Sequence, residues 1–262
     1  MHVFLVTIPG RRLDAQDQAW ASGVAWLLGL LETQFLDASV ALNLFDEENT
    51  RPAERDLSHR MAEDEAESEL EEELRRREQE VGSDRFWKGY ATIQQDAART
   101  VVLRRWKRGE WPEEFERRKS FLHAHSFVFA VDGFVRTFRV LADTLGAPAV
   151  LADVASRLQG ALPDLKGVRD SAAHLEDRGR GLDKREQPLD LKPVDNSLIK
   201  APGRVLGLSN LNGSKLGYTT EAGEYGEVDV SAMTLTFVGD AFQDAVNAFP
   251  WRGASRTIPH TA

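Results

Sequence analysis

Cysteine is absent from this sequence of 262 residues. Its absence excludes disulfide bonds, thiolate metal sites and cysteine nucleophiles, and it is typical of a protein in a reducing cytoplasm. The glycine-rich phosphate-binding loops, the H-E-x-x-H zinc motif and the G-x-S-x-G nucleophile motif are absent as well. Nucleoside triphosphate hydrolysis, hydride transfer and Ser-His-Asp hydrolysis therefore lack the local signatures that usually support them.

Long hydrophobic runs are scarce. The most apolar run, residues 19–31, contains Ser22 and Gly23 and is shorter than the roughly 20 residues that a membrane span needs. The first ten residues lack the basic region and the long apolar core of a signal peptide, and they fit a strand better. We therefore expect a cytoplasmic protein that makes no membrane contact.

A net excess of positive charge is also missing, because the formal net charge is −9. The acidity is concentrated in residues 46–80, which contain 15 acidic and 6 basic residues, whereas the rest of the chain contains 27 of each. Outside this segment the chain thus carries no net charge that would repel an anionic partner such as RNA. The segment itself is either a solvated insertion or an arm that binds a partner or mimics phosphates.

Apolar residues three or four positions apart indicate helices over most of the chain. Long helices are predicted over residues 14–45, 84–108 and 112–145, and shorter ones over 148–158 and 163–179. Proline at the start and glycine at the end of several of these segments fit the usual helix boundaries. The apolar face of the first helix comprises Trp20, Val24, Leu27, Leu31, Phe35, Ala38, Leu42 and Phe45.

The pattern changes to a period of two after Arg204, which is typical of strands. Asn212-Gly213 is a strong signal for a hairpin turn. Gly239-Asp240 is expected to cap a last helix, and the N-terminal segment Met1–Thr7 is expected to join the sheet. The predicted strands of the hairpin and its neighbour span Val205–Leu211, Ser214–Thr220 and Glu227–Val238.

These patterns predict a mainly α fold: a helical bundle with a small C-terminal antiparallel β-sheet and a terminal helix. The predicted parts are an N-terminal strand and first helix at 1–45, an exposed acidic arm at 46–82, the remainder of the bundle at 83–185, a proline-punctuated connector at 186–203, and the sheet with the terminal helix at 204–262.

Two groups of polar residues in the bundle have alternative interpretations. The run from Arg104 to Arg108, with Trp106 at its centre, either complements a helix dipole or holds nucleic acid by charge and stacking. His123, His125 and Asp132 interrupt an apolar helix, but histidines two positions apart on a helix point in nearly opposite directions and do not converge on a metal. These three residues either support a functional cleft or are structural.

The strongest chemical signal is Arg169-Asp170-Ser171-Ala172-Ala173-His174. Histidine can both accept and donate a proton near neutral pH, and arginine presents a planar cation that suits a phosphate. Asp170 and His174 are four residues apart, so a continuous helix would let the carboxylate hold the imidazole. Leu165, Val168, Ala172 and Leu175 would form the buried face of that helix.

This segment resembles the R-x4-6-H motif of HEPN domains, in which the residue after the arginine is typically Asn, Asp or His, as Asp170 is here. The resemblance covers about ten residues in sequence and otherwise concerns the helical architecture. It implies a HEPN-like helical bundle that forms a homodimer with the motifs of two protomers facing a shared cleft. Active members of the family are endoribonucleases that need no metal, and many are toxins or defence effectors.

Carried over to this chain, the resemblance makes Arg169 and His174 catalytic, with Asp170 orienting them, in cleavage of RNA by attack of the 2′-hydroxyl. No metal and no other cofactor is expected. RNA, a second copy of the chain and a cognate antitoxin or regulator protein are the expected partners. The alternative function is a non-catalytic HEPN-like binding or dimerisation module. Cations that follow the motif and that are expected to touch substrate phosphates are Arg178, Arg180 and Lys184.

Overall fold

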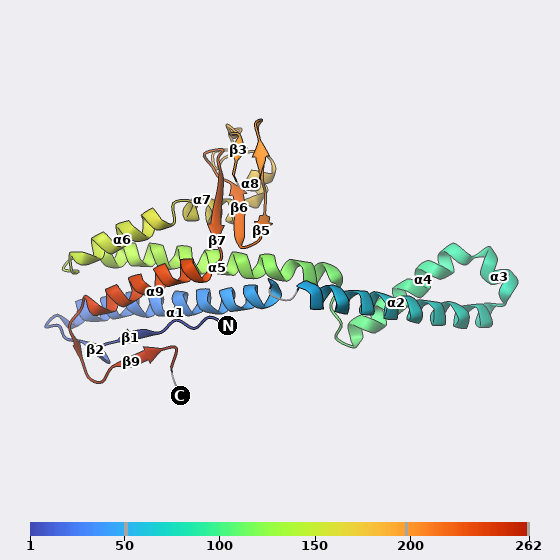
Figure 1. Cartoon of the computed structure of the whole chain (residues 1–262), viewed down its shortest axis with the longest axis horizontal. Coiled ribbons are helices and arrows are strands. Elements are labelled where there is room, and N and C mark those ends of the chain that lie inside the picture. The colour runs from blue at the N-terminus through green and yellow to red at the C-terminus, as the bar shows by residue number, and fades with distance from the viewer. Residues whose placement is uncertain (50–51, 197–198, 261–262) are drawn as a thin grey trace. The chain divides into compact units, whose positions relative to one another are not determined.

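A computed structural model describes residues 1–49, 52–196 and 199–260 of the chain (Figure 1). The fold is mainly helical, with small antiparallel sheets and a helix near the C-terminus, which confirms the predicted fold class. The chain divides into two compact units. The main unit comprises Met1–Asp46 and Ser120–Ala262, and the inserted unit comprises Glu47–Lys119.

The core of the main unit lies between helices that run side by side in Figure 1. They are α1 (Gln18–Asn49), α5 (Glu113–Ala142), α6 (Val150–Ala161) and α9 (Ala232–Asn247), with α1 and α5 each extending into the inserted unit. Phe35, Phe134 and Phe242 meet at its centre, where ring centroids are 5.9 Å apart for Phe35–Phe242 and 6.1 Å apart for Phe134–Phe242. Such aromatic contacts add to the stability that burial of the rings provides.

Helix α1 is long and apolar enough, by length and composition, to cross a membrane. In this fold its apolar face lies in the core, because Leu31, Phe35 and Leu42 are fully buried. The predicted helical face of this segment is therefore the face that packs. This arrangement is compatible with a soluble protein.

The C-terminal hairpin forms where Asn212-Gly213 predicts it. Strands β5 (Asn210–Asn212), β6 (Lys215–Thr219) and β7 (Tyr225–Asp229) make an antiparallel sheet in that order. Gly213 has a φ of 59°, a conformation that glycine adopts without steric cost. The predicted extension of the third strand to Val238 is wrong, because β7 ends at Asp229 and α9 begins at Ala232.

The start of α9 also corrects the predicted helix cap. Ser231 accepts a hydrogen bond from the backbone N–H of Thr234, so Ser231 caps the helix and Gly239-Asp240 lies in its interior. Gly239 lies close to Phe35 there, and a Cβ atom on it would be 3.3 Å from the ring, which is a tight contact. Apolar residues at helical spacing outweigh the strand-like composition of this segment.

The N-terminal strand does not join the hairpin sheet as predicted. Instead β1 (Val6–Ile8) pairs with β9 (Arg256–Ile258), and β2 (Arg12–Leu13) pairs with β8 (Trp251–Arg252), both antiparallel. The predicted connector carries one short antiparallel pair, β3 (Val194–Asp195) with β4 (Lys200–Ala201). Strand pairing between the two ends of a chain leaves no local sequence signal, which is why the sequence pattern missed it.

The segment predicted as one helix over 163–179 forms two helices, α7 (Leu165–Ala173) and α8 (Leu175–Gly179). The break is at His174, whose φ of −121° and ψ of 47° are not helical. No proline or glycine stands at the break. The buried guanidinium of Arg178 instead bonds to Ser171 Oγ at 3.3 Å and to the carbonyl of Leu182 at 2.6 Å, which fixes α8 against α7.

The inserted unit contains α2 (Pro52–Val81), α3 (Ser83–Lys88), α4 (Tyr90–Lys107) and the start of α5. Helix α2 packs along α4, so the acidic segment forms one side of a helical hairpin, and most of its described side chains are exposed. The predicted helix over 84–108 is interrupted at Gly89 between α3 and α4.

Acidic residues of α2 bind the basic residues of α4. The buried carboxylate of Glu73 accepts hydrogen bonds from Arg104 Nη2 at 3.1 Å and from Arg77 Nε at 3.0 Å, and it also pairs with Arg76. Arg108 Nη2 lies 2.6 Å from Glu69 Oε1. At least two of the cations around Trp106, Arg104 and Arg108, therefore form ion pairs within this unit. These ion pairs are a third explanation for the basic run, beside a helix dipole and nucleic-acid binding.

Candidate active site on helix α7

The side chain of Arg169 is held by carboxylates of two helices. Its Nε donates to Asp132 Oδ2 on α5 at 2.7 Å, and its Nη1 lies 2.9 Å from Asp170 Oδ1. Arg136 Nε, one turn along α5, lies 3.0 Å from the same Asp132 oxygen. The Asp132 side chain is 4 % exposed and the Arg169 side chain 16 %, so these ion pairs are largely shielded from water. They fix the guanidinium in one orientation.

The charges around Arg169 do not cancel. Lys166 Nζ lies 3.8 Å from Asp170 Oδ2, which gives a group of three cations and two carboxylates. Within this ion-paired group the cations therefore exceed the carboxylates by one. An anion such as a phosphate would be attracted to this place.

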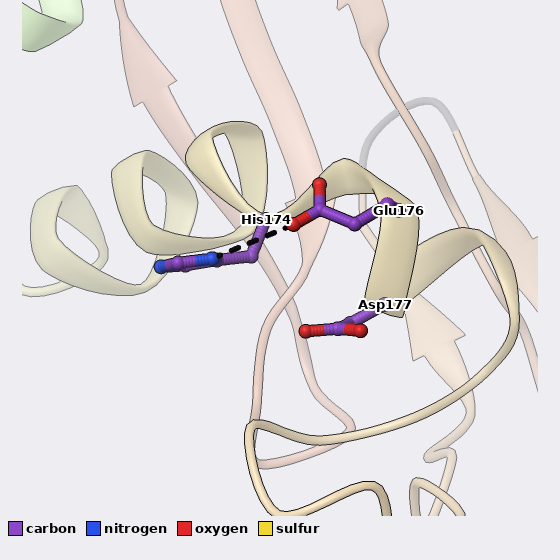
Figure 2. A group of neighbouring side chains, drawn as sticks. All are labelled: His174, Glu176 and Asp177. Carbon is purple, nitrogen blue, oxygen red and sulfur yellow. Dashed lines mark ion pairs between the residues drawn. The ribbon is translucent and has the colours of Figure 1, made fainter.

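His174 occupies the break between α7 and α8, and its side chain is 58 % exposed. Its backbone N–H donates to the Asp170 carbonyl at 3.0 Å. Its Nδ1 lies 3.8 Å from Glu176 Oε1 (Figure 2). The expected pairing of the Asp170 carboxylate with the imidazole is replaced by these contacts, because φ at His174 is −121° and its side chain leaves the direction that it would have in a continuous helix.

The break brings Glu176 close to His174, although a continuous helix would point these two side chains in nearly opposite directions; Asp177, three residues after His174, would share its face in a continuous helix. Ligand atoms of His174, Glu176 and Asp177 all lie within 4.8 Å of one another (Figure 2). Residues two apart on an α-helix point about 200° apart, so the sequence pattern did not indicate that His174 and Glu176 would meet. The sequence signals for this group were the spacing of three between His174 and Asp177 and the density of titratable residues after Ala173.

The three cations expected to bind substrate phosphates lie in different environments. Arg178 is 1 % exposed and holds α8 against α7, so its guanidinium faces the interior and acts as an anchor. Arg180 Nη2 lies 2.6 Å from Asp177 Oδ1, and Lys184 Nζ lies 3.2 Å from Glu221 Oε1. These two side chains are 58 % and 65 % exposed, so they remain accessible to an anion.

Of the residues on α5 that could support a cleft, Asp132 and His125 have defined contacts. Asp132 accepts the hydrogen bond from Arg169 Nε. His125 Nε2 lies 2.5 Å from the hydroxyl of Tyr218, which is buried on β6, and so joins α5 to the sheet. The sequence pattern had identified both residues as polar exceptions, but it did not indicate which of them would reach α7.

One cavity lies in the inserted unit and contains none of the motif residues. It has a volume of about 820 Å³ and lies between α2, α4 and the start of α5, with Val101, Trp106 and Trp111 among its lining residues. Because no motif residue lines this cavity, it gives no evidence about the chemistry at Arg169.

No protein family model, no curated protein and no solved structure matches this chain. The resemblance to HEPN domains thus rests on the motif at Arg169–His174 and on the helical architecture.

Proposed function

We propose that this protein is a metal-independent endoribonuclease of the HEPN type, in the cytoplasm, that cleaves RNA through its 2′-hydroxyl. The observation that carries the proposal is the fixed guanidinium of Arg169, held by Asp132 and Asp170, with a net positive charge around it and an exposed imidazole five residues along. A preorganised cation near a proton-transfer group is what cleavage of a phosphodiester requires.

The proposed reaction is attack on the phosphodiester by a nucleophile within the RNA itself. The ribose 2′-oxygen attacks phosphorus, the bond from phosphorus to the 5′-oxygen breaks, and the products carry a 2′,3′-cyclic phosphate and a 5′-hydroxyl. His174 removes the proton of the 2′-hydroxyl or protonates the departing 5′-oxygen. Arg169 stabilises the charge that develops on the phosphate oxygens. The 2′-hydroxyl is an internal nucleophile, so the reaction needs no metal-activated water.

A second copy of the chain is proposed to complete the site. The side chains of Arg169 and His174 make separate contacts within one protomer, and the family that the motif resembles combines the motifs of two protomers in one cleft. Leu122, Phe129 and Val140 on α5 are 62 %, 43 % and 55 % exposed and share a helical face with Arg136. These three side chains form an apolar strip that is interrupted by the exposed Ser126 and Arg136, and the strip suits a homodimer interface near Asp132.

Phe129→Glu is expected to convert the dimer into a monomer, because it places a charge in the apolar strip. Sedimentation velocity at several protein concentrations measures this change. Leu145→Glu is the matched control, since Leu145 is 92 % exposed in the turn after α5 and should tolerate the same substitution. A wild-type chain that stays monomeric at all concentrations would contradict the proposed dimer.

The activity is tested with purified protein, EDTA and RNA oligonucleotides of mixed sequence. Cleavage is expected to leave 2′,3′-cyclic phosphate ends, and a 2′-deoxy substitution at the cleaved position should block it. DNA of the same sequence should remain intact. Absence of cleavage in every RNA, or equal cleavage of DNA, would refute the ribonuclease.

Asp132 is proposed as a positioning residue for Arg169. Asp132→Asn removes the charge that holds the guanidinium and is expected to lower kcat about 100-fold, the size of effect that a small misplacement of a catalytic group produces. Asp132→Glu should restore part of the activity. A structural role alone would lower the melting temperature in both variants without this difference in kcat. Asp143→Asn, an exposed position on the turn after α5, is the control.

The second candidate function is a non-catalytic binding module, and one observation favours it. The Nε and Nη1 atoms of Arg169 already contact carboxylates of the same chain, so its charge is partly neutralised before any ligand arrives. A dimer that binds RNA or a partner protein without cleaving RNA would support the module. If cleavage is found, a toxin or defence role with a cognate antitoxin or regulator protein becomes testable by growth on expression of the wild type and of His174→Ala.

A further inference from the structure

The break between α7 and α8 creates a group of three potential metal ligands. His174 lies at the break, and Glu176 and Asp177 are in the first turn of α8. Figure 2 shows the carboxylate of Glu176 on the side of the imidazole that carries Nδ1, with the Asp177 carboxylate near both. The ligand atoms come from four consecutive residues, so binding an ion would order little additional chain.

The donor atoms lie somewhat farther apart than in a tetrahedral metal site. Ligand atoms about 2.1 Å from a tetrahedral ion lie about 3.4 Å from one another. Nδ1 of His174 is 3.8 Å from Glu176 Oε1, and ligand atoms of all three residues are within 4.8 Å. The His174 and Glu176 side chains are 58 % and 70 % exposed, so small rotations can bring them to the required distances.

Arg180 is the group that competes with an ion for Asp177. Its Nη2 contacts Asp177 Oδ1 at 2.6 Å, which leaves the second carboxylate oxygen for another ligand. Arg180 is 58 % exposed, so the ion pair gains little in water and can rearrange.

We propose that His174, Glu176 and Asp177 bind one divalent transition-metal ion of the Zn²⁺ or Co²⁺ class. One imidazole nitrogen with two carboxylates suits such ions, whereas Ca²⁺ and Mg²⁺ prefer sites made only of oxygen. Three protein ligands leave a fourth position for water.

The consequence for activity rests on the proposed ribonuclease function. A ring nitrogen that is bound to a metal cannot take part in proton transfer. The ion would therefore inhibit RNA cleavage, and EDTA would restore it. In this way the site would regulate an enzyme that needs no metal for its reaction.

The site is tested by titrating the full-length protein with ZnCl₂ and CoCl₂, without RNA, by isothermal calorimetry and by the visible absorption of bound Co²⁺. One ion per chain is expected for the wild type. Glu176→Gln and His174→Ala should each weaken binding at least 10-fold, since loss of even a residue that only orients a ligand typically costs about 10- to 100-fold in metal affinity. His260→Ala, a substitution at an exposed histidine outside the site, should have no effect.

Three results would overturn the assignment: no saturable binding, binding that both site variants retain, or binding of Ca²⁺ as tight as that of Zn²⁺. The titration does not depend on catalysis, so its failure is distinct from failure of the ribonuclease proposal. If RNA is cleaved, Zn²⁺ should inhibit the wild type more strongly than Glu176→Gln, because Glu176 has no role in the proposed cleavage.

Discussion

Substitution of His174 by alanine is expected to reduce RNA cleavage in EDTA by about 100- to 10,000-fold, the contribution that a general acid or base typically makes. The reason is that His174 is the imidazole nearest in sequence to Arg169 and is accessible to a substrate at the end of α7. Rates are measured under single-turnover conditions with a labelled RNA, so that product release does not hide the chemical step.

Two controls make this result specific. His260→Ala removes another exposed histidine and should cleave like the wild type. Because His174 is largely exposed, its substitution should leave the melting temperature within a few degrees of the wild-type value. Equal cleavage by the wild type and His174→Ala would exclude His174 from the chemistry and favour the binding module.

The second large effect is expected at Glu73 in the inserted unit. Hydrogen bonds from Arg76, together with those from Arg77 and Arg104, lower the pKa of Glu73 from 4.5 to about 2, against the opposing effect of burial. A carboxylate whose pKa is lower in the folded state stabilises that state above its unfolded pKa. This contribution, about 2–3 kcal/mol at neutral pH, is lost as the pH falls from about 4.5 to about 2.

Glu73→Gln is therefore expected to destabilise the pairing of α2 with α4 by about 2–3 kcal/mol at pH 7 and to have a much smaller effect near pH 2. Hydrogen exchange of peptides from α2 and α4, corrected for intrinsic rates, measures this local stability. Glu71→Gln is the matched control, since Glu71 is 61 % exposed and pairs only across one turn with Arg75. A difference between wild type and Glu73→Gln that does not depend on pH would contradict the role of the ionised carboxylate.

Local chemistry allowed much of the secondary structure to be predicted. The hairpin at Asn212-Gly213 forms because these residues favour a tight turn whatever surrounds them. The buried face of α1 follows from apolar residues at helical spacing, as Leu31, Phe35 and Leu42 show. Predictions were less successful where two local signals competed, as in the segment after Asp229, where a serine cap and helical spacing outweighed strand-like residues.

In the acidic segment, composition alone does not identify which glutamate is buried. Its charge predicted a solvated surface, but Glu73 is 3 % exposed because arginines from α2 itself and from α4 surround it. Which glutamate is buried depends on the helix that packs alongside, and that helix begins several residues after α2 ends. The same reasoning applies to Arg178, whose burial follows from the path of the chain through Leu182.

The sequence by itself determined the chemical groups of the candidate site and their order, Arg169, Asp170 and His174, together with the helical class of the fold. It could do so because residue chemistry and helical periodicity act over a few positions along the chain. Only the tertiary structure decided that Asp132, 37 residues away, holds Arg169, and that a break at His174 turns the imidazole toward Glu176. Such contacts depend on how α5 and α7 pack, and no spacing within either segment encodes them.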